Sequence, residues 1–168
     1  MAGALIVTAE LGDADLAWLD GLRRRHYPPE RNQLPAHLTM FHAVPPSAEG
    51  EVRGRLAAQA TEPPPHTMIA GLMNLGGGVA FRVVSEGLDR IRGDLAADLH
   101  GLLTAQDSAG WRPHVTIQNK VPPRTARALF EDLQASFEPR PLHIRGLGLH
   151  RYLDGPWQFL ADYPFRGR

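Results

Sequence analysis

A ten-residue stretch that begins with histidine occurs twice in the chain, 77 residues apart. The first copy spans residues 37–46 and the second spans residues 114–123. Without a gap, the two copies share the His, the Thr two residues later, and the Val-Pro-Pro that closes each run. At the same offset, Leu56 recurs as Leu133. The sequence therefore predicts two related halves, each with one His-x-Thr dyad.

The first copy is typical of a β-strand that ends at a proline pair. Side chains of a strand alternate between its two faces. We therefore expect His37, Thr39 and Phe41 to share one face and His42 to point to the opposite one. His42 would then lie outside any site that His37 forms.

The second copy predicts a matching strand. His114, Thr116, Gln118 and Lys120 are expected on one face, while Val115, Ile117 and Val121 lie on the opposite, mainly apolar face. If the two halves face each other, both His and both Thr side chains converge on one cleft, which is the usual place for a ligand site.

Such a convergence suits phosphoryl transfer without a metal ion. A hydroxyl or water that attacks a phosphodiester must lose a proton, and the leaving oxygen must gain one. Two imidazoles that titrate near neutral pH can serve as the base and the acid. The hydroxyls of Thr39 and Thr116 can donate hydrogen bonds to the non-bridging phosphate oxygens, where charge develops in the transition state. The pattern indicates His37 and His114 as an acid–base pair and leaves open which is the base.

Further side chains are candidates for contacts with the substrate. Lys120 is expected on the face of His114 and can add a charge-assisted contact to phosphate. Arg82 is a second candidate cation, although the sequence does not fix its face. Phe41 or Trp111 can stack on a nucleobase.

Other sites are less consistent with the motifs. A single His in a polar strand face favours a structural role, but two copies in register favour a site. A metal centre needs ligands that converge, whereas His37 and His42 are expected on opposite faces and no HExxH motif is present. A serine nucleophile would need a G-x-S-x-G elbow, which the chain lacks. We predict neither a metal nor a cofactor.

Apolar periodicity places the dyads in a regular succession of elements. Strands are predicted at residues 4–10, 37–44, 66–72, 79–84, 114–121, 142–152 and 157–163. Helices are predicted at residues 13–26, 47–60, 86–104 and 125–136. We therefore predict a single domain over residues 1–168, with related halves at about 1–73 and 79–151 and an additional terminal strand.

Three local features have their own explanations. The run Gly76–Gly78 precedes a strand and lacks a following Lys-Ser/Thr, which favours a hairpin turn over a phosphate loop. The basic residues 23–26 end a helix, where cations complement the helix dipole; an RNA-contacting patch is the alternative. Near Gly146 the apolar alternation slips by one residue, which predicts a β-bulge.

Charge and cysteine content restrict the partners. Lys+Arg and Asp+Glu each number 18, so the zero net charge predicts no general attraction to nucleic acid, and any phosphate site must be a local cluster. Without cysteine, disulfides and thiolate metal ligands are excluded. With no basic leader and no long apolar run, we expect a soluble cytoplasmic protein that makes no membrane contact and is a monomer.

The dyads resemble those of the two-histidine phosphoesterase superfamily, which is defined by two H-x-[ST]-x motifs in duplicated halves. His37-Leu38-Thr39-Met40 and His114-Val115-Thr116-Ile117 match both motifs. The match is most similar to the bacterial 2′-5′ RNA ligase-like branch, in which Pro usually precedes the second motif, as Pro113 does here. Residues 147–165 also look like the final strand pair of that branch. One tetrapeptide alone is weak evidence, whereas the pair in this order and spacing is specific.

What this resemblance implies is an α+β fold with two lobes, in which two antiparallel sheets flanked by helices surround a central cleft. It also implies metal-independent action on 2′,3′-cyclic phosphates or 2′-5′ phosphodiester linkages of nucleotides or RNA. The motif His residues would be catalytic and the motif Thr residues would bind phosphate. Lys120 lies one residue beyond the position at which some relatives have Arg.

The expected function is thus that of a 2′,3′-cyclic phosphodiesterase or 2′-5′ RNA ligase-like enzyme. A protein that binds nucleotides or RNA ends in the same cleft, without turnover, is the alternative. A purely structural role for the His pair is a second rival.

Overall fold

The computed structural model of the chain describes residues 3–167. Met1 and Ala2, part of the segment expected to carry no basic leader, and Arg168 lie outside the described residues. The helices are α1 (Asp13–His26), α2 (Glu49–Gln59), α3 (Glu86–Asp98), α4 (Ala105–Ser108) and α5 (Pro123–Ala135), with short 3-10 turns η1 (Pro29–Arg31) and η2 (Pro46–Ala48). The strands are β1 (Leu5–Leu11), β2 (Leu38–Val44), β3 (Met68–Asn74), β4 (Val79–Val84), β5 (His114–Gln118), β6 (Arg140–Pro141), β7 (Ile144–Tyr152) and β8 (Trp157–Pro164).

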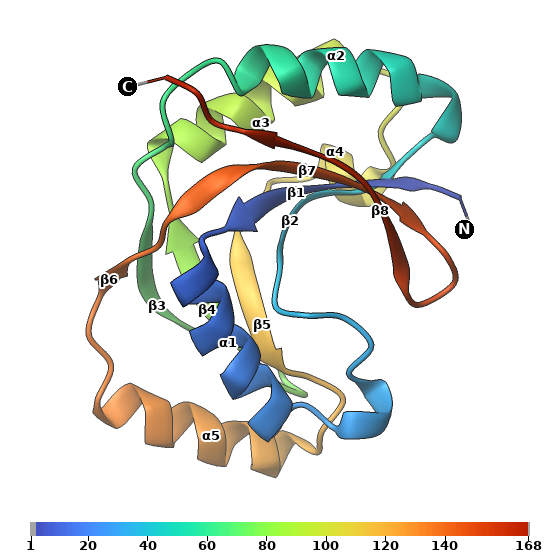
Figure 1. The fold of residues 1–168 in the computed structure, drawn as a ribbon. Helices are drawn as coiled ribbons and strands as arrows, with labels where there is room; N and C mark the ends of the chain where they lie inside the picture. The colour runs from blue at the N-terminus through green and yellow to red at the C-terminus, as the bar shows by residue number, and fades with distance from the viewer. Residues whose placement is uncertain (1–2, 168) are drawn as a thin grey trace.

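Within residues 3–167 these strands form two four-stranded antiparallel sheets, in the orders β2-β1-β7-β8 and β5-β4-β3-β6. Helices α2 and α3 lie over the first sheet, and α1 and α5 lie beside the second (Figure 1). The predicted α+β fold, with two antiparallel sheets and flanking helices, is confirmed. No helix among these residues is long and apolar enough to cross a membrane.

The two sheets do not coincide with the two halves of the sequence. The first half supplies β1 and β2 to one sheet but β3 to the other. The second half supplies β4, β5 and the short β6 to the second sheet but β7 to the first, so β3 and β7 are exchanged between the sheets. Each sheet therefore needs residues from both halves. The duplication of halves within one domain stays a prediction. If the halves are related, each contributes one strand to the sheet of the other.

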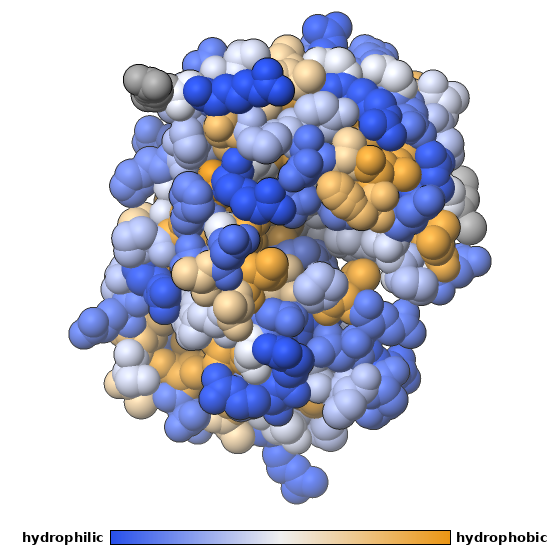
Figure 2. Space-filling view, in the orientation of Figure 1, coloured by the Kyte–Doolittle hydropathy of each residue, from blue (hydrophilic) through white to orange (hydrophobic). Residues whose placement is uncertain are grey.

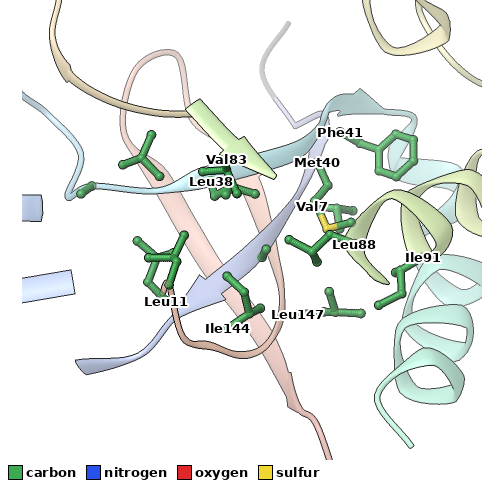
Figure 3. Close-up of a cluster of buried hydrophobic side chains, with 14 of the residues drawn as sticks. Val7, Leu11, Leu38, Met40, Phe41, Val83, Leu88, Ile91, Ile144 and Leu147 are labelled. Atoms are coloured by element: carbon green, nitrogen blue, oxygen red, sulfur yellow. The ribbon is translucent and has the colours of Figure 1, made fainter. Parts of the chain in front are cut away.

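Apolar side chains from the first sheet and α3 form one part of the core. Val7, Met40 and Leu147 are at most 1% exposed and lie against Leu88 and Ile91 of α3 (Figure 3). Each such side chain stabilises the fold by about 1.5–3 kcal/mol through its removal from water. This packing anchors the buried face of β2, and thereby the position of the first dyad on its other face.

Each motif strand contains a β-bulge at the same place in the repeat. Thr8 and Val7 of β1 pair with Thr39 and Phe41, which leaves Met40 as the extra residue of β2. Ala80 and Val79 of β4 pair with Thr116 and Gln118, which leaves Ile117 as the extra residue of β5. A bulge places two successive residues opposite one residue of the partner strand. The extra residue and the one after it, Phe41 or Gln118, are both buried, so it is the next side chain, His42 or Asn119, that lies on the face of the motif Thr.

The bulges overturn the predictions that assumed strict alternation. Phe41 is 0% exposed, and the guanidinium of Arg92 lies 4.2 Å from its ring centre, so Phe41 belongs to the core and does not reach a substrate. His42, predicted to point away, lies on the same face as Thr39. Lys120 is likewise misplaced by the prediction: β5 ends at Gln118, and Lys120 is exposed in the following turn with φ +63°.

Other local predictions have mixed outcomes. The glycine run forms the turn of the β3–β4 hairpin, in which the Leu75 N–H donates to the Gly78 carbonyl at 2.8 Å. The bulge near Gly146 is confirmed, since Gly146 pairs with Glu10 while Ile144 pairs with Leu11. The helix predicted for residues 86–104 is too long, because the chain turns at Gly101 with φ +84°.

Candidate functional site

A cavity of about 280 Å³ lies where β2 and β5 approach each other, between the two sheets. The space-filling view shows an indentation between the upper and lower parts of the molecule (Figure 2). The cavity is lined by Arg23, Tyr27, Leu34, His37, Thr39, His42, His114, Thr116, Asn119 and Trp157. The two dyads, 77 residues apart in sequence, thus contribute to one polar cleft.

The two motif histidines are held in the same way. Nδ1 of His37 lies 2.8 Å from the carbonyl oxygen of Pro35, and Nδ1 of His114 lies 2.7 Å from that of Arg112. A carbonyl oxygen only accepts hydrogen bonds, so each Nδ1 carries the hydrogen. In the neutral ring Nε2 then keeps its lone pair, and in the charged ring it carries a proton to donate. Both rings are therefore fixed in the state that proton transfer through Nε2 requires.

The terminal strand breaks the symmetry between the two histidines. The ring of Trp157, at the start of β8, lies 4.7 Å from that of His37 between centroids, at 59°. Burial lowers the pKa of His37 to about 4; the Pro35 carbonyl opposes this shift, and the positive charges of Arg23 and His114 add to it. His37 is therefore neutral at neutral pH.

Each motif Thr is also held through its backbone by the other half of the chain. Trp111 Nε1 donates to the carbonyl oxygen of Thr39 at 3.1 Å. Arg23 Nη1 donates to the carbonyl oxygen of Thr116, also at 3.1 Å. The first bond connects β2 to the segment that precedes β5, and the second connects β5 to α1. Trp111 is held by this contact and is not among the residues that line the cavity, and its stacking on a nucleobase stays a prediction.

Arg23 is the cation that the structure brings into the cleft. It is 4% exposed; its Nε donates to Asn32 Oδ1 at 2.7 Å, and its guanidinium lies 4.2 Å from the ring centre of Tyr27. Burial lowers the pKa of Arg23, and the neighbouring Tyr27 and Asp20 oppose that effect. A guanidinium stays protonated in proteins, so the charge remains.

The sequence held a signal for Arg23, although the prediction treated residues 23–26 as one basic cluster. Arg23 lies four residues after the buried Leu19, so it extends the apolar face of α1. Arg24 and Arg25 point to solvent.

A buried carboxylate positions His42. Asp107 of α4 is 1% exposed and accepts hydrogen bonds from the backbone N–H groups of His42 and Ala43 at 2.9 Å, and from His42 Nδ1 at 3.1 Å. Burial alone would raise the pKa of Asp107, but the bonds from His42 and Ala43 outweigh it and hold the pKa below its ordinary value. Asp107 thereby clamps the residues that follow the β2 bulge. In the second half of the chain, Asn119 occupies the position that corresponds to His42.

Replacement of Asp107 by Ala should destabilise the fold by about 2–4 kcal/mol, because it leaves two backbone donors beside the bulge without their acceptor. Urea unfolding followed by circular dichroism measures this loss. Asp107→Asn, which keeps one acceptor oxygen, should lose less, and Asp132→Ala, at an exposed position on α5, should lose less than about 0.5 kcal/mol. Equal stability of the two Ala variants would contradict the role given to Asp107.

Two further features lie outside the cleft. Arg82 pairs with His114 across the β4–β5 ladder, but its Nη2 donates to the Ala70 carbonyl at 3.1 Å and the side chain does not line the cavity. A separate cavity of about 400 Å³, between α1 and α5, contains no motif residue. Within residues 3–167 no three His, Asp or Glu side chains are grouped to hold a metal ion.

Comparison with known proteins places the chain in a family. A sequence model of the 2′-5′ RNA ligase superfamily matches residues 11–156. The chain belongs to this superfamily. The resemblance to two-histidine phosphoesterases that the dyads carried is thereby confirmed. No curated protein sequence matches the chain.

Solved structures share the fold of this superfamily member along its whole length. TT0787 of Thermus thermophilus has 18% sequence identity and a TM-score of 0.68, with 98% of this chain and 99% of that chain covered. E. coli LigT complexed with 3′-AMP has 15% identity and a TM-score of 0.59, with 98% and 99% covered. LigT complexed with NADP+ has 16% identity and a TM-score of 0.58, with 99% of each chain covered.

Proposed function

We propose that this protein is a phosphoesterase that hydrolyses 2′,3′-cyclic phosphates or 2′-5′ phosphodiester linkages of nucleotides or RNA, without a metal ion or cofactor. The observation that carries the proposal is the matched pair of imidazoles, each bound through Nδ1 to a carbonyl two residues earlier, in one polar cavity. Membership of the 2′-5′ RNA ligase superfamily supports it.

His37 acts as the base in the hydrolytic direction, since its pKa of about 4 keeps Nε2 unprotonated at neutral pH. A water oxygen attacks the phosphorus as its proton passes to His37 Nε2. The bond from phosphorus to the leaving ribose oxygen breaks, and that oxygen takes the proton of His114 Nε2. The product is a phosphate monoester and a free hydroxyl. Each proton transfer contributes about 10²–10⁴-fold to the rate.

Three kinds of side chain stabilise the charge on the phosphate. The hydroxyls of Thr39 and Thr116 donate to its non-bridging oxygens, and Arg23 places a full positive charge in a cleft partly shielded from water. His42, with Nδ1 bound to Asp107, can donate from Nε2 when it is protonated. These donors replace the metal ion that many phosphoryl-transfer sites use.

The substrate is a small ligand or the end of an RNA chain. A cavity of about 280 Å³ holds one phosphate and part of a nucleoside. The related fold of LigT has been solved complexed with 3′-AMP and with ATP, which supports nucleotide binding here. A monomer in the cytoplasm is part of the same proposal.

Incubation with 2′,3′-cyclic AMP and with 2′-5′-linked ApA, followed by ³¹P NMR, tests the proposal. We expect a phosphate monoester signal to replace the substrate signal. Saturable binding without conversion of either compound would instead favour the nucleotide-binding alternative. Neither binding nor conversion would favour a structural role for the histidines.

The pH dependence of kcat/KM should reflect the lowered pKa of His37. The base must be neutral, so activity that depends on it should persist as pH falls from 7 to about 5 and decline only near pH 4. An ordinary histidine with a pKa of about 6.5 would lose most of its basic form by pH 5. The measurement is initial rates below KM across pH 4–8, with ¹H–¹⁵N NMR of the imidazoles to assign the titration. A His37 titration near 6.5 would contradict the assignment of the base.

The same shift makes the fold less stable in acid. Between pH 6.5 and about 4 the unfolded chain binds a proton at His37 while the native protein does not, so the free energy of unfolding falls as pH falls through this window. The expected loss is on the order of 1–3 kcal/mol. Urea unfolding at pH 7 and pH 4.5 measures it, and His37→Gln should lose less than the wild type over that interval. An equal loss would place its source in other groups.

A further inference from the structure

A second cavity, of about 320 Å³, adjoins the proposed catalytic cleft. The two cavities share Leu34, His37 and Trp157, so a ligand with its phosphate beside His37 can extend from one into the other. The second cavity is lined by residues of β1, β7 and β8, by Leu16 of α1 and by the segment 34–37, and His37 is the one motif residue among them. It is therefore placed to receive a part of the substrate other than the reacting phosphate.

One glycine of β7, Gly148, makes room for polar side chains on the floor of this cavity. Glu10 and Thr8 of β1 pair with Gly146 and Gly148 of β7. A Cβ atom at position 148 would lie 2.6 Å from Thr8 Oγ1 and would also overlap Glu10 Oε1. Both contacts are shorter than real Cβ atoms show. The absence of a side chain at position 148 is what lets this carboxylate and hydroxyl lie across the sheet.

The Glu10 carboxylate keeps hydrogen-bonding capacity for a ligand. His150 Nε2 lies 3.0 Å from Thr8 Oγ1, which makes a hydrogen bond, but 3.6 Å from Glu10 Oε1, which is too long for one. The side chain of Glu10 is 21% exposed, so it is neither at the surface nor sealed from the cavity. An ionised carboxylate accepts hydrogen bonds and donates none. A group that binds there must present N–H or O–H donors.

Aromatic rings line the same cavity as the carboxylate. The ring of His150 lies 5.4 Å from that of Trp157 and 5.9 Å from that of Phe159 between centroids. Phe159 is 54% exposed and lines the cavity, so its ring is accessible to a ligand that enters. Flat π faces in the same cavity as a hydrogen-bond acceptor suit a planar ligand whose edge carries the donors.

We propose that this second cavity binds the nucleobase of the substrate and that Glu10 selects guanine. The inference rests on the proposed function, because the phosphate beside His37 fixes which part of the ligand enters. Guanine presents two adjacent donors, N1–H and the 2-amino group, which fit the two oxygens of one carboxylate. Adenine and cytosine present one amino donor next to a ring acceptor, and the carbonyls of uracil repel a carboxylate. A bidentate contact of this kind discriminates between bases by about 5- to 150-fold.

The test compares kcat/KM for the 2′,3′-cyclic phosphates of guanosine, inosine and adenosine. We expect guanosine to exceed adenosine by about tenfold or more, with inosine, which lacks the 2-amino group, in between. Glu10→Gln should lower the value for guanosine about tenfold and leave that for adenosine nearly unchanged, and Glu10→Asp should restore part of the preference. Glu62→Gln, at an exposed position away from both cavities, is the matched control. Equal values for the three bases, or a preference that Glu10→Gln leaves unchanged, would overturn the inference.

Calorimetric binding of 3′-GMP and 3′-AMP separates this inference from the proposed function. If none of the cyclic phosphates is hydrolysed, the proposed function fails, yet tighter binding of 3′-GMP that is lost in Glu10→Gln would still support guanine selection. If hydrolysis proceeds but the two nucleotides bind equally, the inference on Glu10 fails alone. Phe159→Ala should weaken both nucleotides, since it removes a stacking surface and no base-specific donor or acceptor.

Discussion

Replacement of His37 or His114 by Ala is expected to lower kcat/KM for a 2′,3′-cyclic nucleotide by about 10²–10⁴-fold. In the proposed mechanism each variant removes one of the two Nε2 atoms that move protons at the phosphate. His37→Ala leaves the attacking water without a base, and His114→Ala leaves the departing oxygen without an acid. The fold should persist, because both side chains are only partly buried in the cleft.

The double variant His37→Ala/His114→Ala sharpens this experiment. Residues that act as a unit in one transition state give strongly non-additive losses, so the double variant should be far less impaired than the product of the two single losses. His100→Ala, at an exposed position after α3, is the matched control and should keep the wild-type rate. Steady-state rates with circular dichroism of each variant provide the measurement. Wild-type activity in either single variant would rule out the proposed mechanism.

The second large effect is expected from the motif threonines. Thr39→Val and Thr116→Val keep the shape of the side chain but remove the hydroxyl that, in the proposed mechanism, donates to a non-bridging phosphate oxygen. Loss of one such donor costs about 10²–10³-fold in kcat where the bond strengthens in the transition state. The backbone carbonyls of both residues, which accept from Trp111 and Arg23, are unchanged by the substitution. The loss should therefore appear in activity and not in stability.

Thr→Ser variants at the same positions are the conservative control. Serine keeps the hydroxyl, so Thr39→Ser and Thr116→Ser should recover most of the activity that the Val variants lose. Thr125→Val, exposed near the start of α5, should have no effect. A Ser variant as impaired as its Val counterpart would mean that the methyl group and its packing, and not the hydroxyl, carry the effect.

The cleft could be predicted from the sequence because the His-x-Thr motif that lines it occurs twice. His37 and His114 share their neighbours at a constant offset, and two copies in register are hard to explain by packing alone. The alternation of apolar residues placed the strands to within a few residues. The exchange of β3 and β7 between the sheets was not predicted, because the hydrophobic pattern of a strand does not encode which partner it pairs with.

The rest of the site depends on features without a local signature. The bulges at Met40 and Ile117 reverse the side-chain alternation after them. Phe41 therefore lies in the core and His42 lines the cleft, the opposite of what strict alternation predicts. The position of a bulge depends on the partner strand and on the packing of the core. An apolar residue at a bulge cannot be distinguished in the sequence from an apolar residue in a regular strand. Asp107 was not recognised, because its partner His42 is 65 residues away in the chain.

The difference between the two histidines also comes from tertiary structure. The motifs are nearly symmetric, so the sequence left base and acid unassigned. Trp157 belongs to the terminal strand, which lies outside the repeat, and it packs against His37. This contact contributes to the burial of the ring, and burial lowers the pKa of His37 to about 4. The assignment of His37 as the base thus follows from a contact that only the folded chain makes.

Two histidines, and no metal ion, carry the chemistry in the proposed mechanism. Hydrolysis of a 2′,3′-cyclic nucleotide by the wild-type protein in excess EDTA tests this most directly, with His37→Ala and His114→Ala measured in the same buffer. We expect that the wild type keeps its full rate in chelator, that added Mg²⁺, Mn²⁺ or Zn²⁺ does not raise it, and that both variants keep their loss of about 10²–10⁴-fold with and without metal. Loss of the wild-type rate in EDTA, with recovery on addition of a divalent metal, would contradict the mechanism.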